Sequence, residues 1–267
     1  MRSISRTLSS VAALALGLGI TFSAASGVSQ QMTQPPAAPT QETNTVEPDA
    51  LQALKDMSTY LNTLSSFEVR ADTTRDLVTQ NGHRVQLGGV SDYKVRRPNG
   101  FRIDVQTDYK NRQFFYDGKQ FTVFAPQLGY YASTPAPATN IETIDLLEKR
   151  FGIDLPLDDL FLWNSPESHQ AEDLASGFYV GPATVDGVAT DHYAFRQKNR
   201  PIDWEIWIQQ GDQPVPRKLV IIDRSDEARP AYSARLAWTA NPTLTADTFI
   251  FHPGADAKQI RLATLNQ

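Results

Sequence analysis

The segment IDWEIWIQQGDQPVPRKLVIID, residues 202–223, constrains the fold most strongly, because its hydrophobicity alternates with a period of two. In its first half the apolar residues that share one face of an extended chain are Ile202, Trp204, Ile206 and Ile208. Side chains of a strand point alternately to opposite faces, so this segment buries one face in a sheet. Polar residues separate the two halves and indicate a turn. The segment therefore predicts an antiparallel hairpin.

Short runs with the same period recur along most of the chain. In FRIDVQTD, Phe101, Ile103 and Val105 alternate with charged or polar residues. Asp117-Gly118 lies between two aromatic-rich runs and is a strong signal for a two-residue hairpin turn. Turns this short join neighbouring strands that pair antiparallel.

Other segments have the period of an amphipathic helix. Between residues 48 and 64 the apolar side chains recur at spacings of three and four, at Leu51, Leu54, Met57, Leu61 and Leu64. In TNIETIDLLEKRFG, Thr139 and Glu142 have the spacing of a capping box, and Gly152 marks the helix end. A further short helix is expected at residues 158–163.

The order of these elements predicts the fold class. One helix, about six strands, one or two helices and about five more strands follow one another. A continuous antiparallel sheet of this size twists strongly and tends to curl. We therefore predict an α+β fold, in which a curled, unclosed antiparallel β-barrel of about eleven strands wraps over two to three helices.

Residues 1–25 have the features of a secretory signal peptide. Arg2 and Arg6 precede a run of apolar and small residues, and Ser23 and Ala25 occupy the positions that a signal peptidase recognises. The run is short and glycine-interrupted for a membrane span, which needs about 20 predominantly apolar residues; an uncleaved anchor is the alternative. Because the chain has no cysteine, no lipid-modified N-terminus is expected. These features predict a periplasmic protein.

The remainder is expected to divide into a leader and one domain. Residues 26–47 are rich in Gln, Pro and Thr and have few large apolar side chains, so we expect them to be disordered. Residues 48–267 have a length that suits a single large domain. No transmembrane segment is expected in the mature chain, since nothing later in the sequence is apolar for long enough.

Composition and motifs exclude several function classes. Without cysteine the chain forms no disulfide or thiolate metal site. Removing Arg2 and Arg6 leaves 23 basic against 30 acidic residues, a net charge of −7 that disfavours nucleic acid as a partner. The four histidines, which lie outside any recognisable metal spacing, are His83, His169, His192 and His252. We therefore expect no enzyme activity, no catalytic residue, no metal and no cofactor.

Two charged clusters leave alternatives open. The basic residues Lys94, Arg96, Arg97 and Arg102 form either a solvated strand end or a contact for a partner or a phospholipid headgroup. The acidic residues Asp154, Asp158 and Asp159 lie near an expected helix start, where they favour the helix dipole or, alternatively, bind calcium.

Several motifs together resemble a bacterial family of predicted periplasmic proteins, domain of unknown function 2092. They include YLNTLSSFEVRADT, RRPNGFRIDV, FFYDGKQFTVF, YVGPATVDGVATDHYAFRQ and DWEIWIQQGDQPVPRKLVI. The resemblance covers nearly the whole expected mature chain. It implies a fold like that of the lipoprotein carriers LolA and LolB, in which an unclosed barrel holds acyl chains in an apolar cavity.

Nine apolar residues are candidates for lining such a cavity, because their periodicity places them inside the curled sheet or on its helices: Phe101, Val105, Phe121, Leu147, Phe151, Trp204, Ile206, Tyr232 and Trp238. Aromatic stripes of this kind also form ordinary cores. We expect a periplasmic binding protein for a lipid or another apolar ligand, in the narrower case a lipid or lipoprotein carrier or chaperone. The alternative is an interaction or sensor module without a small-molecule ligand, which binds an envelope protein through an exposed Trp207 or a long edge strand.

The N-terminal features predict the start of the mature chain. After expression in a Gram-negative host and extraction of the periplasm, the protein is expected to begin at Ser26. Intact-mass measurement checks this, and an exported chain that retains residues 1–25 would contradict it.

Overall fold

The computed structural model describes residues 45–157 and 173–265, which form one twelve-stranded sheet with the order β12-β6-β5-β4-β3-β2-β1-β11-β10-β9-β8-β7. In chain order the strands are β1 Ser66–Val78, β2 Arg84–Arg96, β3 Phe101–Thr107, β4 Asn111–Tyr116, β5 Gln120–Ala125, β6 Tyr130–Pro135, β7 Leu174–Val185, β8 Val188–Gln197, β9 Ile202–Gln209, β10 Pro216–Asp223, β11 Ala231–Ala240 and β12 Lys258–Gln259. All neighbours pair antiparallel except β12 and β6, which pair parallel.

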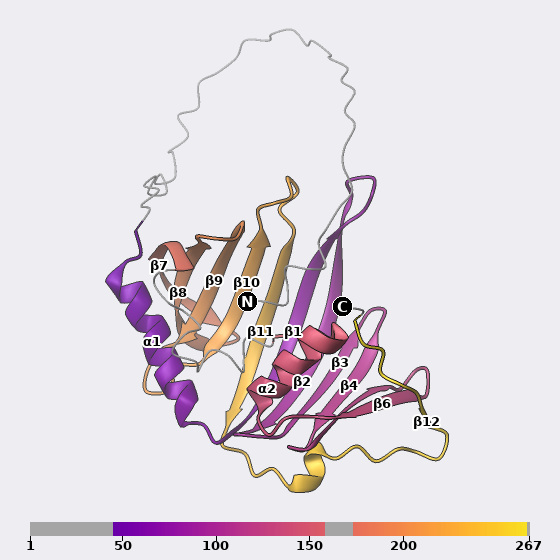
Figure 1. The fold of residues 1–267 in the computed structure, drawn as a ribbon. Coiled ribbons are helices and arrows are strands. Elements are labelled where there is room, and N and C mark those ends of the chain that lie inside the picture. The colour runs from indigo at the N-terminus through magenta and orange to yellow at the C-terminus, as the bar shows by residue number, and fades with distance from the viewer. Residues whose placement is uncertain (1–44, 158–172, 266–267) are drawn as a thin grey trace, which may run out of the picture.

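The sheet curls and stays open, with β12 and β7 as its two edges (Figure 1). The predicted α+β fold class, a curled and unclosed antiparallel sheet with few helices, is confirmed. The twelfth strand is the two-residue β12, which is too short to give a periodic signal. The aromatic-rich segment DTFIFHP, residues 247–253, was also expected from its composition to form a strand, but it begins within the 3₁₀-helix η4 (Ala246–Phe249). The expected helix at 158–163 lies outside the described residues.

Strand β1 joins the two halves of the sheet. It pairs with β2 along its whole length, from Ser66↔Arg96 to Val78↔Arg84. Its other edge pairs with β11, which follows more than 150 residues later, from Phe67↔Ala240 to Arg75↔Tyr232. The inward positions of both halves therefore form one continuous inner face.

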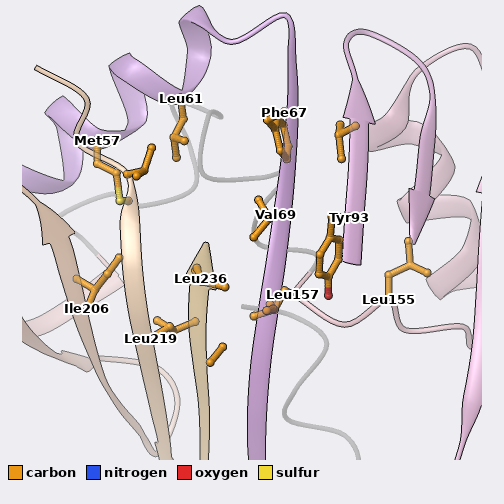
Figure 2. Packing of buried hydrophobic residues seen from close by; sticks show 14 of the residues in the cluster. Met57, Leu61, Phe67, Val69, Tyr93, Leu155, Leu157, Ile206, Leu219 and Leu236 are labelled. Atoms are coloured by element: carbon orange, nitrogen blue, oxygen red, sulfur yellow. The ribbon is translucent and has the colours of Figure 1, made fainter. Parts of the chain in front are cut away.

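The helices lie against this inner face (Figure 1). Helix α1 (Pro48–Thr63) has Pro48 in its first turn and buries Ala50, Leu54, Met57 and Leu61. Figure 2 shows Met57 and Leu61 in the same packed layer as side chains from β9, β10 and β11. The apolar stripe was predicted from its spacing, although Leu51 is only half-buried.

The second helical segment begins with the predicted capping box. The hydroxyl of Thr139 accepts a hydrogen bond from the backbone N–H of Glu142 at 3.2 Å, at the start of α2 (Asn140–Leu146). The chain continues as a π-helical turn, η2 (Leu147–Phe151), and ends at Gly152, whose φ is +62°. Glycine adopts this left-handed conformation without the strain of a Cβ atom.

The C-terminal segment follows the outer face and then returns to the helices. Phe251 packs against three rings on the outer side of β4, β5 and β6, with centroid distances of 5.3 Å to Phe115, 5.1 Å to Phe124 and 5.0 Å to Tyr131. After β12, the backbone N–H of Leu265 donates to the carbonyl of Arg150 in η2 at 2.8 Å. This strap ties the β6 side of the sheet to η2.

Close packing between β7 and β8 makes Gly177 a sensitive position. A Cβ atom there would lie 2.6 Å from the ring of Phe195, whereas one at Gly254 would meet nothing within 4 Å. We expect Gly177→Ala to lower the free energy of unfolding by about 1–3 kcal/mol through overpacking. Gly254→Ala is the control and is expected to change it by less than about 0.5 kcal/mol. Urea unfolding measures both, and equal effects of the two substitutions would contradict the packing.

Candidate functional site

A cavity of about 460 Å³ lies on the inner side of the sheet, between β1, β4, β5, β11 and the loop that follows η2. Its lining residues are Arg75, Lys110, Arg112, Phe114, Val123, Gly152, Ile153, Asp154, Pro156, Leu157 and Tyr232. They divide into an apolar wall and a group of charged side chains. Three basic residues and one carboxylate give the described lining a net charge of +2.

Strand register and a buried hydrogen bond build the apolar wall. Phe114 of β4 lies opposite Val123 of β5, so both side chains project from the inner face. The phenol of Tyr93, buried on β2, donates to the carbonyl of Pro156 at 2.9 Å and holds the loop after η2 over the sheet. Figure 2 shows Leu157 of this loop beside Tyr93. The loop thereby supplies the second side of the cavity.

The charged residues come from inward positions near the ends of the strands. Arg75 lies opposite Tyr232 in the pairing of β1 with β11, and Arg112 lies opposite Val105 in the pairing of β3 with β4. Lys110 occupies the turn between β3 and β4. Burial and, secondarily, the positive charge of Arg112 lower the pKa of Lys110 from its usual value. The two cations are therefore close enough to repel each other.

The structure places all nine predicted cavity residues in or against one hydrophobic cluster. Six are buried in it, namely Phe101, Val105, Phe121, Leu147, Trp204 and Ile206, and three pack against it partly buried, namely Phe151, Tyr232 and Trp238. Trp204 stacks on Phe195 with a centroid distance of 4.3 Å and is 1% exposed. Of the nine, Tyr232 lines the cavity described above.

Sequence reasoning missed most of the lining. Phe114 and Val123 follow the same alternation as Phe101 and Phe121, so the hairpin at Asp117-Gly118 contained the signal for them. Arg75 and Arg112 gave a second signal, because each is a charged residue at an inward position of its strand. The residues after Gly152 follow no period, and their position depends on the tertiary contact with β2.

The outer face around Trp207 differs from the exposed surface that was expected. Trp207 is only 9% exposed. The ring of His192 stacks on it at 3.8 Å, and the ammonium group of Lys218 lies 4.1 Å from its centroid. The imidazole of His192 also contacts the carboxylate of Glu205 at 2.8 Å, and burial lowers its pKa below the usual value. Trp207 is thus covered by neighbouring strands and offers little free surface.

The basic cluster at the end of β2 is engaged within the protein. The guanidinium group of Arg97 donates to the carbonyls of Leu61 and Leu64 at the end of α1, and burial lowers its pKa. Arg102 pairs with Asp104 at 2.9 Å, and Lys94 lies 3.5 Å from Glu68. Arg97 therefore anchors α1 to the sheet.

Neither a metal centre nor a membrane-spanning helix occurs within residues 45–157 and 173–265. No group of three or more His, Asp or Glu side chains in these ranges is arranged to hold a metal ion. Asp154 lines the cavity, while Asp158 and Asp159, the other members of the acidic cluster, lie outside the described residues. No helix in the described part is long and apolar enough to cross a membrane.

Comparison with solved structures finds partial similarities at low identity. The lipoprotein LppX of Mycobacterium tuberculosis is 14% identical, with 75% of this chain and 100% of that chain covered and a TM-score of 0.48. LprF of Mycobacterium bovis is 17% identical, with 75% and 98% covered and a TM-score of 0.44. A LolA superfamily protein of Nitrosomonas europaea is 10% identical, with 76% and 97% covered and a TM-score of 0.34.

No curated protein matches the sequence. A family model does match, over residues 50–263, and it describes a predicted periplasmic protein, DUF2092. This match covers most of the chain and agrees with the resemblance seen in the sequence motifs. The chain belongs to the DUF2092 family of predicted periplasmic proteins.

Proposed function

We propose that the protein binds a lipid or another apolar ligand in the cavity on the inner face of its sheet. It would do so in the periplasm, as a single domain of residues 48–267, after removal of the signal peptide, residues 1–25. The cavity carries this proposal. Its volume of about 460 Å³ falls within the range of small-molecule sites, roughly 300–1,000 Å³. An acyl chain gains about 0.8 kcal/mol for each methylene that it buries.

The composition of the lining favours binding over catalysis. The described lining contains five large apolar residues, Phe114, Val123, Ile153, Pro156 and Leu157, together with the ring of Tyr232. It includes no histidine, serine or threonine, so Asp154, Lys110 and Tyr232 are the groups in it that could take part in acid–base chemistry. A carrier or chaperone for lipids needs only such a wall and a way to release its ligand.

Filling the cavity tests this proposal. Val123 projects into the cavity from β5, so Val123→Trp is expected to occupy much of the apolar wall and weaken binding of a fluorescent fatty acid at least about tenfold. Val220→Trp is the matched control, because Val220 is half-buried and points outward between the inward Leu219 and Ile221. Fluorescence titration and thermal unfolding measure affinity and folding.

The proposal predicts that the Val220→Trp variant binds as the wild type does and that both variants fold. If a folded Val123→Trp variant binds the fatty acid with unchanged affinity, the ligand does not lie in this cavity. Native mass spectrometry of protein purified from the periplasm provides a second check, because a reproducible lipid mass is expected on the folded chain.

One observation favours a second function, binding of an envelope protein at the β7 edge. β7 pairs on one side with β8, and on its other side Gly177 and Tyr179 are hydrogen-bonded to residues 45–47. Three consecutive large residues on it, Phe178, Tyr179 and Val180, are 42%, 42% and 48% exposed. An extended segment of a partner can add to the part of this edge that follows Tyr179 through backbone hydrogen bonds. A stoichiometric envelope protein on lipid-free chain, lost in a Phe178→Ser variant, would support this function over the first.

A further inference from the structure

The charges in the cavity are concentrated beside its apolar wall. Arg112 and Phe114 are two residues apart on β4 and both line the cavity. Alternate residues of a strand share a face and lie about 7 Å apart, at about 3.3 Å per residue. A ligand that contacts the Phe114 ring therefore extends naturally to the guanidinium group of Arg112.

We propose that the ligand is an anionic amphiphile, whose carboxylate or phosphate group lies against Lys110 and Arg112 while its hydrocarbon chain lies against Phe114 and Val123. This inference rests on the proposed function and names its ligand class. An arginine fork forms two parallel hydrogen bonds with a carboxylate or a phosphate, and a lysine adds a compact positive charge.

The neighbours of the two cations support this assignment. Among the described residues no carboxylate forms an ion pair with Lys110 or Arg112. The guanidinium group of Arg112 donates to the adjacent carbonyl of Asn111 at 2.7 Å, which uses one of its five N–H groups. Asp154 and Arg75, the other charged lining residues, have interactions of their own. Lys110 and Arg112 are thus the charges in the described lining that are best placed to receive an anion.

Repulsion between the two cations gives a physical reason for binding an anion. Partial burial and then the positive charge of Arg112 disfavour the charged form of Lys110, although its side chain is largely exposed. An anionic group between them removes this repulsion and forms charge-assisted hydrogen bonds with both side chains. The chain of the ligand meanwhile covers the apolar wall, so the two halves of an amphiphile match the two parts of the lining.

The test compares ligands that differ only in their head groups. Dodecanoate, dodecyl phosphate and dodecanol are each tested for displacement of a neutral naphthylamine probe from the full mature protein. Inorganic phosphate is tested in the same way, as an anion without a hydrocarbon chain. We expect the two anionic amphiphiles to bind roughly 10-fold to 100-fold more tightly than dodecanol, as one or two charge-assisted hydrogen bonds would give. Inorganic phosphate is expected to displace no probe at millimolar concentration.

Variants identify the residues involved. Lys110→Gln combined with Arg112→Gln is expected to abolish the preference for anionic amphiphiles and to leave dodecanol binding unchanged. Lys110→Arg combined with Arg112→Lys keeps both charges and is expected to retain most of the preference. The matched control, Lys119→Gln with Lys198→Gln, changes the net charge equally at two exposed lysines in the β4–β5 and β8–β9 turns. It is expected to keep the full preference.

The outcomes separate this inference from the proposed function. Equal affinity of the wild type for dodecanol and the anionic amphiphiles would overturn the inference and leave the apolar site in place. The inference would also be overturned if the Lys110→Gln/Arg112→Gln variant keeps the preference for anionic amphiphiles, or if the Lys119→Gln/Lys198→Gln control loses that preference. Displacement by inorganic phosphate as strong as that by dodecyl phosphate would assign the site to a free anion. If no amphiphile binds the wild type at all, the proposed function fails as well.

Discussion

The pairing of β1 with β11 is the interaction on which the rest of the structure depends. It brings together segments separated by more than 150 residues and converts two antiparallel meanders into one sheet. The apolar residues at inward positions, Phe67, Val69 and Ala71 on β1 and Leu236 and Ala234 on β11, then face the same helices. Without this pairing each half would have an open edge and half of a core.

The cavity forms where this pairing extends beyond the packed core. Along β1 the inward side chains change from Phe67, Val69 and Ala71, which are at most 1% exposed, to the half-buried Thr73 and Arg75. Arg75 and its pairing partner Tyr232 line the cavity, which the loop after η2 covers on one side. A cavity thus arises at the border between the core and the open part of the sheet, with apolar side chains on one side and cations on the other. This border has the chemistry that the proposed amphiphile requires.

Alternation and turn signals were sufficient to predict strands β1 to β11, helix α1, the capped start of α2 and the inward orientation of residues such as Phe101 and Trp204. They were insufficient to predict which inward residues are packed and which line open space, because that depends on the lengths of helices that cover the sheet and on contacts such as the one between Tyr93 and Pro156. Trp207 illustrates the same limit. Its outward direction was evident from its parity, but its burial results from His192 and Lys218 on neighbouring strands. Arg75 and Arg112 are exceptions to the alternation of inward apolar and outward polar residues. A charged residue at an inward position is therefore the sequence signal that best indicates where the cavity lies.

Cross-linking with a photoreactive fatty acid can locate a bound hydrocarbon chain on the protein. A diazirine at mid-chain should insert into residues that contact the hydrocarbon, and peptide mass spectrometry locates the insertion. Labelling is expected to be concentrated in residues 110–125 and 152–157 and to be competed by unlabelled dodecanoate. Labelling confined to the outer face or to the β7 edge, with those two segments unmodified, would contradict binding in the cavity.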